Sequence, residues 1–396
     1  SLYFAQGLPY VVVMSVAVIL FKRMGMSNTD IALYTSGLNL PWVIKPLWSP
    51  LVDLLKTKRW WIVVMQILVG AGLAGIALTI QGPLAFRYCL AFMWLLAFSS
   101  ATHDIAADGF YMLGLNEKKQ AYFVGIRNTF YRFAVIFGQG ILVMFAGWLE
   151  QRYAREMPET AAIPQAWSLT FYLLTILFAL LFVYHYLFLP HPRRDTCTLP
   201  PQQASAGRVF KEFLGTFTSF FQKKHIVSAL IFILLYRFAE AQLVKITSPF
   251  LLDTPATGGL ALSTAEVGFI YGTIGVIALT IGGIVGGIAM ARRGLKSCLW
   301  TMTIAMNLPN IVYLYLSFAR PESIGIISGC VAIEQFGYGF GFTSLPYFMM
   351  LFSNGKHQTA HYAICTGFMA LGLMLPGMIS GCLLYTSPSP RDGATS

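Results

Sequence analysis

Apolar residues dominate the chain in runs that are long and continuous rather than alternating. Residues 60–80 (WWIVVMQILVGAGLAGIALTI) and 169–189 (LTFYLLTILFALLFVYHYLFL) each approach the roughly 20 apolar residues with which a helix crosses a bilayer core. Such runs are too long for an ordinary strand, and the sequence lacks the short alternating segments of an outer-membrane barrel. The pattern therefore predicts an all-α membrane protein that crosses the bilayer many times.

Eleven runs have this apolar character, and short polar loops separate them. The predicted spans are residues 2–21, 31–52, 60–80, 86–112, 122–149, 167–189, 226–252, 264–291, 297–318, 323–352 and 359–385. The even-numbered loops hold fifteen Lys and Arg residues, whereas the odd-numbered loops hold six. Because cytoplasmic loops are enriched in these residues, we expect the even loops and the N-terminus to be cytoplasmic.

The longest connection divides the spans into two groups. Residues 190–225 are polar, basic and contain prolines, so we expect an N-terminal six-helix half at 1–189, a cytoplasmic linker at 190–225 and a C-terminal half at 226–385. Only five helices fall in the second half, and residues 386–396 (TSPSPRDGATS) resemble translated adapter sequence, which indicates a non-native tail and a missing last helix. Two six-helix halves resemble the plan of the major facilitator superfamily, in which the halves are parallel repeats.

Two short basic turns stand at equivalent places in the halves. SPLVDLLKTKR (49–59) joins the second and third spans, and GGIAMARRGLK (286–296) joins the eighth and ninth. Both resemble the superfamily's signature loop G-x-x-x-D-R-x-G-R-R, although the first lacks the glycine and the second has Met290 near the acidic position. The candidate residues of this loop are Asp53, Lys56, Arg59, Arg292 and Arg293.

Composition agrees with a membrane protein and limits the partners. Charged residues are 11% and hydrophobic residues 56% of the chain, whereas about a quarter of a soluble domain is charged. The net charge of +11 comes from loops in which orientation explains the basic residues, so no nucleic-acid partner is expected. The six cysteines lie singly, without the paired spacing of a disulfide framework or a zinc site, and we expect no metal and no cofactor.

Ionisable residues inside the spans are the candidate chemistry. Asp104 and Asp108 lie one turn apart on one face of the fourth span. The fifth span carries Arg127 and Arg132 at similar depths, which predicts pairing of Asp108 with Arg127 and of Asp104 with Arg132. His103 points about 100° away from Asp104. It is either a polar residue at a helix end or a group that titrates near neutral pH.

Three further spans carry charged residues. Arg237, Glu240 and Lys245 lie in the seventh span, where the first two are three residues apart and can satisfy one another. Lys45, in the second span, either snorkels to the interface or binds a ligand. Glu334 has no basic residue within its own span, the tenth, which favours a protonatable site.

The energetic cost of these charges indicates a role in transport. A charge near the bilayer centre is unfavourable by about 3 kcal/mol or more, and such groups commonly line a cavity or a proton path. The candidates for proton coupling are Asp104, Asp108, Glu240, Glu334 and His103. The candidates for substrate binding or ion pairing are Arg127, Arg132, Arg237, Lys45 and Lys245. The alternative is a clamp in which these charges only neutralise one another.

An ordered set of short motifs, spread along most of the chain, is similar to the AmpG-type muropeptide permeases of the major facilitator superfamily. The motifs are QGLP (6–9), KPLWSPLVD (45–53), DIAADGF (104–110), LYRFAEA (235–241), AEVG (265–268), EQFGYGFGFTS (334–344) and LFSNGKHQTAHYA (351–363). The related acetyl-coenzyme A transporters share the DIAxDG element. His103 departs from both families, which usually have glutamine at that place.

The resemblance implies proton-driven import of anhydro-muropeptides, with or without a peptide, across a bacterial inner membrane. Such uptake supports peptidoglycan recycling and feeds β-lactamase induction. We expect a monomer whose partners are a small sugar-peptide substrate, protons and the lipid bilayer. The alternatives are a carrier of acyl-coenzyme A or another anionic metabolite, a channel, and an intramembrane enzyme. No catalytic set such as H-E-x-x-H occurs, so we expect no enzyme and no catalytic residue.

Overall fold

The computed structural model places helices along most of the chain. It describes residues 1–26, 34–35, 37–196, 206–240, 243, 247, 250–251, 254–255, 259–262 and 264–386. The regular structure of these residues is helical throughout. The chain forms two compact units, which are described separately. The first unit is Ser1–Leu115, Phe130–Phe220 and Gly355–Gly367, and the second is Asn116–Thr129, Phe221–Asn354 and Phe368–Ser396.

Among the described residues, seven helical segments are long and apolar enough to cross a membrane. They are Leu2–Arg23, Lys58–Thr79, Ala85–Gly114, Glu117–Tyr153, Glu159–Phe188, Ile270–Arg293 and Leu295–Ala319. An eighth is added if Gly207–Phe221 and Ile226–Glu240 are counted as one broken span. The seven segments coincide with seven of the predicted spans, which confirms a multi-pass membrane protein.

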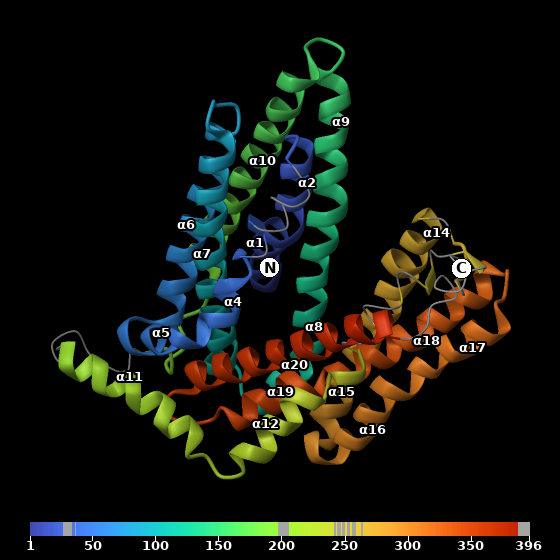
Figure 1. The fold of residues 1–396 in the computed structure, drawn as a ribbon. Coiled ribbons are helices and arrows are strands. Elements are labelled where there is room, and N and C mark those ends of the chain that lie inside the picture. Colours follow the sequence, from blue (N-terminus) through green and yellow to red (C-terminus); the bar gives the residue numbers. More distant parts are fainter. Residues whose placement is uncertain are drawn as a thin grey trace. The chain divides into compact units, whose positions relative to one another are not determined.

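The first unit is a bundle of long helices around an apolar core. Its elements are α1 (Leu2–Val11), η1 (Val12–Val16), α2 (Ala17–Arg23), α4 (Leu40–Ile44), η2 (Lys45–Leu47), α5 (Ser49–Leu55), α6 (Lys58–Thr79), α7 (Ala85–Gly114), the end of α8 (Glu117–Ile136), η3 (Phe137–Leu142), α9 (Val143–Tyr153), α10 (Glu159–Phe188) and α11 (Ala206–Phe221). Helix α6 packs against both α7 and α10, and α1 packs against α7 (Figure 1). Fully buried Phe21, Leu73 and Phe171 come from three of these helices and meet in the core.

The second unit is held together by close contact between helices. Its elements are the start of α8, α12 (Ile226–Leu235), α14 (Thr264–Phe269), η6 (Ile270–Gly275), α15 (Val276–Arg293), α16 (Leu295–Asn307), η7 (Leu308–Asn310), α17 (Ile311–Ala319), α18 (Ile324–Phe342), α19 (Ser344–Phe352) and most of α20 (Gln358–Thr386). A Cβ at Gly282 of α15 would lie 2.2 Å from the carbonyl oxygen of Phe336 on α18. Small residues therefore allow these two helices to approach closely.

The predicted second span, residues 31–52, is not one helix. In the part that the structure describes, the chain forms α4, a 3₁₀ turn (η2) and α5 in succession. Pro46 and Pro50 stand in the first turns of η2 and α5, respectively. Proline has no N–H to continue a preceding helix and its ring clashes with the turn before it, so the chain breaks here. The break leaves Lys45 buried at the start of η2.

Three predicted features fall wholly or partly outside the described residues. Residues 206–221 of the expected linker form α11, whereas residues 197–205 are not described. The position of Lys245 and residues 387–396 of the expected tail also lie outside the described part of the chain.

Candidate functional site

The carboxylate of Asp104 on α7 binds side chains from two other elements of the first unit. Gln6 of α1 donates a hydrogen bond to Oδ1, and the ammonium of Lys45 at the start of η2 forms an ion pair with Oδ2. The side chains of Lys45 and Asp104 are 8% and 15% exposed. The snorkelling interpretation of Lys45 is therefore wrong, because its ammonium points into the unit at a carboxylate.

Asp108, one turn further along α7, also faces α1. Its Oδ1 accepts a hydrogen bond of 3.1 Å from the Tyr3 hydroxyl, and the carboxylate is buried. Because Tyr3 and Gln6 lie three residues apart on α1, one face of that helix contacts both acids. The predicted pairing of Asp108 with Arg127, and of Asp104 with Arg132, stays a prediction. The contact between Asp104 and Lys45 was not anticipated from the sequence.

Aromatic rings gather next to α1 in the same unit. Tyr10 of α1 meets Trp42 of α4 edge to face, with 5.0 Å between the ring centroids, and lies 6.3 Å from the ring of Tyr131. On the other side of the break, the indole of Trp48 donates to the Thr102 hydroxyl on α7 at 3.2 Å. Aromatic rings with a few polar groups are the usual lining of a site for a small ligand.

His103 belongs to a buried polar cluster rather than to a helix end. Its ring is 2% exposed, and α7 continues for eleven residues beyond it to Gly114. The His103 Nε2 atom lies 3.1 Å from Nε2 of Gln66 on α6, which in turn lies 2.9 Å from Nδ1 of His185 on α10. The helix-end interpretation is wrong because His103 is buried within α7 and its ring shares a hydrogen bond with Gln66 of α6. Gln66 and His185 were not expected from the sequence, although each interrupts an apolar run.

The charged residues of the second unit include a self-contained pair. Arg237 donates to both carboxylate oxygens of Glu240, through Nε at 2.6 Å and Nη2 at 2.8 Å, which confirms that the two satisfy one another. Nη2 also donates to the Tyr338 hydroxyl at 3.0 Å, and the guanidinium lies 4.7 Å from the ring centroid of Phe342. The planar guanidinium is thus held by two carboxylate oxygens and by aromatic rings.

Glu334, on α18, is a buried acid in a cluster of tyrosines. Its Oε2 accepts hydrogen bonds from the Tyr313 hydroxyl at 3.2 Å and from the Gln335 amide at 2.9 Å. Tyr313 in turn shares a hydrogen bond with Tyr271 of η6. The donors described here are neutral, and a protonatable role for Glu334 stays a prediction.

The signature turn after α5 ties three helix ends together. The buried carboxylate of Asp53 pairs with Lys58 Nζ at 2.8 Å and accepts a hydrogen bond of 2.8 Å from the backbone N–H of Ala360, in the first turn of α20. An acidic side chain at that position satisfies a helix N–H that has no partner within its own helix. The predicted Lys56 instead lies over the ring of Trp60, 5.9 Å from its centroid. Lys58 was not expected from the sequence.

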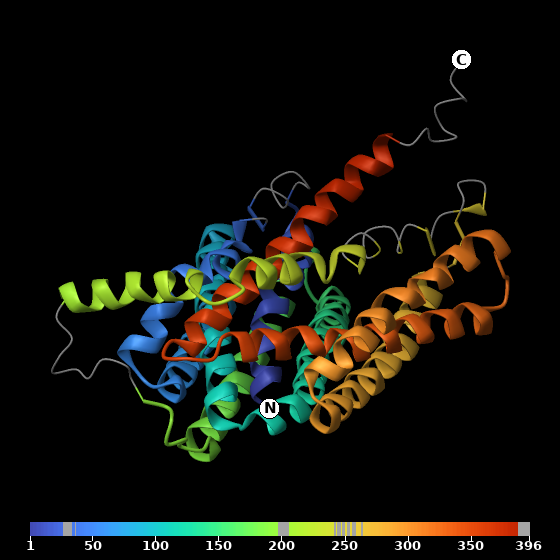
Figure 2. The same cartoon turned by 90° about the horizontal axis from the view of Figure 1, so that it is seen from below.

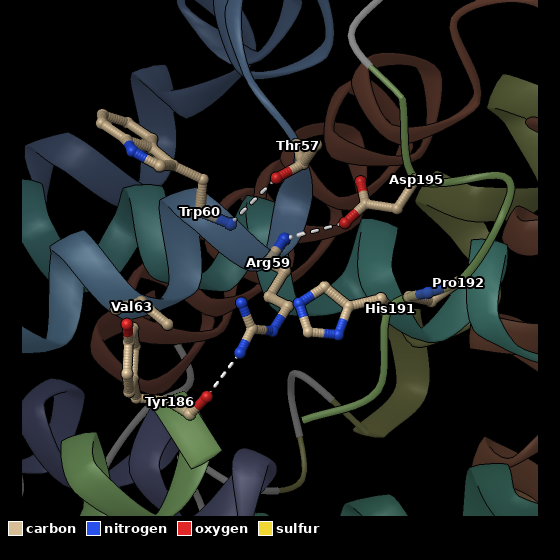
Figure 3. Close-up of a pocket in the computed structure, with 8 residues that line it drawn as sticks. All are labelled: Thr57, Arg59, Trp60, Val63, Tyr186, His191, Pro192 and Asp195. Atoms are coloured by element: carbon tan, nitrogen blue, oxygen red, sulfur yellow. Dashed lines mark hydrogen bonds between the residues drawn. The ribbon is translucent and has the colours of Figure 1, made fainter. Parts of the chain in front are cut away.

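Figure 3 shows a pocket of about 220 Å³ at the first turn of α6. Asp195 accepts hydrogen bonds from the backbone N–H groups of Lys58 (2.6 Å) and Arg59 (3.0 Å), while the Arg59 guanidinium donates to the carbonyl oxygens of Tyr186 and Leu189 at the end of α10. These hydrogen bonds connect the start of α6 with the end of α10 and the residues after it. We therefore interpret the pocket as a feature of the packing of these helix ends and not as a substrate site.

In the second half of the chain, Arg292 and Arg293 are exposed in the last turn of α15. There their charge complements the negative end of the helix dipole. The two signature turns therefore differ in the structure. Asp53 and Arg59 of the first turn contact neighbouring helix ends, whereas Arg292 and Arg293 of the second are exposed.

Comparison with known proteins gives the family. Residues 1–381 match the model of the Major Facilitator Superfamily. The chain belongs to the major facilitator superfamily. The fucose:proton symporter FucP of E. coli superposes with a TM-score of 0.68 at 15% identity, covering 96% of this chain and 90% of that one. The proton:xylose symporter XylE superposes with a TM-score of 0.62 at 12% identity, covering 96% and 86%. Both structures share this superfamily fold.

Two relatives that match most of the sequence are named as transporters. "Putative transporter AmpG 4" of Rickettsia conorii is 26% identical over 377 residues, covering 92% of this chain and 84% of the relative. The "Anhydromuropeptide permease" of Escherichia coli K12 is 24% identical over 385 residues, covering 96% and 72%. The protein is thus a multi-pass secondary transporter and not an enzyme.

Proposed function

We propose that this transporter imports anhydro-muropeptides across a bacterial inner membrane, driven by protons, with its N-terminus in the cytoplasm. The names of its AmpG relatives support the substrate class. The excess of basic residues in the even loops supports the orientation. The observation that carries the proposal is the largely buried ion pair between Lys45 and Asp104, which places an acid and a base inside the helix bundle of the first unit.

The pair supplies a physical route to coupling. A buried charge is strongly unfavourable without its partner, so Lys45 and Asp104 stabilise one another in this site. A proton that binds Asp104 removes the negative charge and leaves the Lys45 ammonium in need of a new partner. A carboxylate of the substrate's peptide provides one through a charge-assisted hydrogen bond. Proton binding and substrate binding therefore favour one another.

The neighbours of the two acids fit this exchange. Gln6 and Tyr3 are neutral donors, so they stay in place whether or not the acids are ionised. Arg127 and Arg132 of α8 are proposed as further partners for Asp108 and for substrate carboxylates. The rings of Tyr10, Trp42 and Tyr131 would pack against the sugars.

A second candidate substrate is acyl-coenzyme A or another anionic metabolite. The DIAADG element at 104–109 favours it, because the acetyl-coenzyme A transporters share this element. Competition by an acyl-coenzyme A, but not by muropeptide, would select this candidate.

The test is uptake of labelled anhydro-muropeptide by permease-deficient cells that express the protein, with and without a protonophore. We expect uptake that the protonophore abolishes and that Asp108→Asn lowers at least about tenfold, the effect of about 1.4 kcal/mol on a rate. Glu156→Gln is the matched control, because Glu156 pairs with Arg152 at an exposed site. Equal uptake by a well-expressed Asp108→Asn variant would assign Asp108 a structural role, and no uptake by the wild type would exclude this substrate.

A further inference from the structure

Helix α11 is divided lengthwise into a covered face and an exposed face. At about 100° per residue, positions 207, 208, 210, 211, 214, 215, 218 and 221 fall on one side, and all of them are exposed. Thr216 and Phe220 lie on the opposite side and are fully buried. The helix therefore lies on the first unit along one face only.

Polar contacts hold the covered face to the first turn of α20 and to the residues just before it. Glu212 pairs with Lys356 at 2.9 Å, and Ser219 shares a hydrogen bond of 3.1 Å with His361. The Phe220 ring packs against the His361 ring, with 5.5 Å between their centroids. These contacts fix the rotation of α11 about its own axis, so the exposed face is determined by the fold.

The exposed face combines an apolar edge with a basic edge. Phe210, Leu214 and Phe221 lie within about 40° of one another around the helix and are 62%, 49% and 51% exposed. Lys211 and Arg208 follow at about 100° and 160° from Phe210, and both are exposed. Large apolar side chains beside basic ones are typical of a helix that lies in the interface of a membrane.

The position of α11 within the first unit agrees with a place at the membrane surface. It contacts the first turn of α20, which Asp53 links to Lys58, the first residue of the membrane-spanning helix α6. Within the same unit, α11 lies toward the lower end in Figure 1 with its axis inclined to α6 and α10, and Figure 2 shows it lengthwise. The helix thus lies at the end of the first unit at which the candidate span α6 begins.

We propose that α11 is an interfacial helix that binds the anionic phospholipid of the surrounding bilayer. Phe210, Leu214 and Phe221 enter the boundary between headgroups and acyl chains. Arg208 and Lys211 bind headgroup phosphates, because both are positively charged and lie on the exposed face of the helix. The bilayer is the occupant because a multi-pass transporter is always embedded in one. The proposal is independent of the transported substrate.

Hydrogen exchange of the whole protein tests the proposal. The protein is placed in nanodiscs of phosphatidylcholine, with or without phosphatidylglycerol, and exchange of the backbone amides of residues 206–221 is measured. We expect phosphatidylglycerol to slow this exchange by roughly thirtyfold, because each basic residue near an anionic surface favours binding by about fivefold. We call this extra protection in the presence of phosphatidylglycerol the phosphatidylglycerol increment. High salt should remove it, since salt screens exposed charges.

Two double variants distinguish the contribution of the apolar edge from that of the basic edge. Leu214→Ser with Phe210→Ser should speed exchange of α11 in both kinds of disc, whereas Arg208→Gln with Lys211→Gln should abolish only the phosphatidylglycerol increment. Thr218→Gln, on the same exposed face, is the matched control and should change nothing. Unchanged exchange of α6 and α10 shows that each variant is folded.

Three outcomes would overturn the proposal. Exchange that is equally slow in detergent and in both discs would mean that the protein alone holds α11. Protection that increases with protein concentration would assign the exposed face to a second copy of the chain. An Arg208→Gln, Lys211→Gln variant that keeps the full phosphatidylglycerol increment would exclude the anionic headgroup as ligand.

Discussion

Each compact unit holds a buried acid–base pair, but the two pairs are built differently. Lys45 and Asp104 are 59 residues apart and join η2 to α7, whereas Arg237 and Glu240 are three apart on one stretch of chain. A movement of η2 relative to α7 would separate Lys45 from Asp104. Arg237 and Glu240 would instead move together, because they lie on one short stretch of chain. The cross-element pair is therefore suited to couple proton binding to a change of conformation, and the local pair to keep two charges neutral.

The largest effect is expected from breaking the cross-element pair on one side. Lys45→Met leaves the carboxylate of Asp104 buried without its cation and should destabilise the protein by about 3 to 5 kcal/mol. The double variant Lys45→Met, Asp104→Asn removes both charges and should recover most of this stability. Thermal unfolding of the purified protein measures both. Losses that simply add in the double variant would contradict a direct pair.

The local pair should tolerate removal of both charges. Arg237→Met with Glu240→Met replaces a buried ion pair by apolar side chains, a change that is often close to neutral for stability. Uptake of labelled substrate should stay within about twofold of the wild type, equivalent to about 0.4 kcal/mol. Loss of protonophore-sensitive uptake in a folded variant would place Glu240 in the coupling mechanism and remove the difference between the two pairs.

Glu334 is a buried acid whose carboxylate accepts a hydrogen bond from Tyr313. Tyr313→Phe removes one hydrogen bond to its carboxylate and should cost about 1 to 3 kcal/mol of stability. Thermal unfolding measures this loss, and Tyr315→Phe, on the same helix and half-exposed, is the control. An unchanged melting temperature in Tyr313→Phe would show that the bond contributes nothing.

The exposed pair on α11 should show the smallest effect. Lys356 lowers the pKa of the Glu212 carboxyl below its usual value, with a smaller contribution from His357 and Arg208. A depressed pKa stabilises the folded state above the unfolded pKa, and this stabilisation is lost as the pH falls through the folded pKa. The protection of α11 amides, corrected for the intrinsic exchange rate at each pH, should therefore fall modestly on acidification, and less so in Glu212→Gln. Identical pH profiles would contradict the contribution of this pair.

The spans could be predicted from the sequence because long apolar runs have few other stable structures in a membrane protein. The break at Lys45 could have been read from Pro46 and Pro50, yet the apolar pattern alone predicts a continuous helix. Contacts between residues that are far apart in the chain could not be predicted from the sequence. The contact of Asp104 with Lys45 depends on how α7 packs beside η2, and spacing within one helix carries no information about it.

The same limit explains the cluster of Gln66, His103 and His185. Gln66 and His185 each interrupt an apolar run, so their sequence context suggests isolated groups. Packing of α6 between α7 and α10 brings the three together in a buried site, where Gln66 shares hydrogen bonds with both histidines. Local spacing was sufficient where both partners lie on one short stretch of chain, as for Arg237 and Glu240.

The most direct test of proton coupling at Asp104 compares two kinds of transport by Asp104→Asn in proteoliposomes. Counterflow exchanges labelled for unlabelled anhydro-muropeptide without net proton movement, whereas an imposed pH gradient drives accumulation. We expect the variant to retain counterflow and to lose accumulation, because the neutral amide that replaces the carboxylate neither binds nor releases a proton. Accumulation at the wild-type level by this variant would contradict the role of the Lys45 and Asp104 pair.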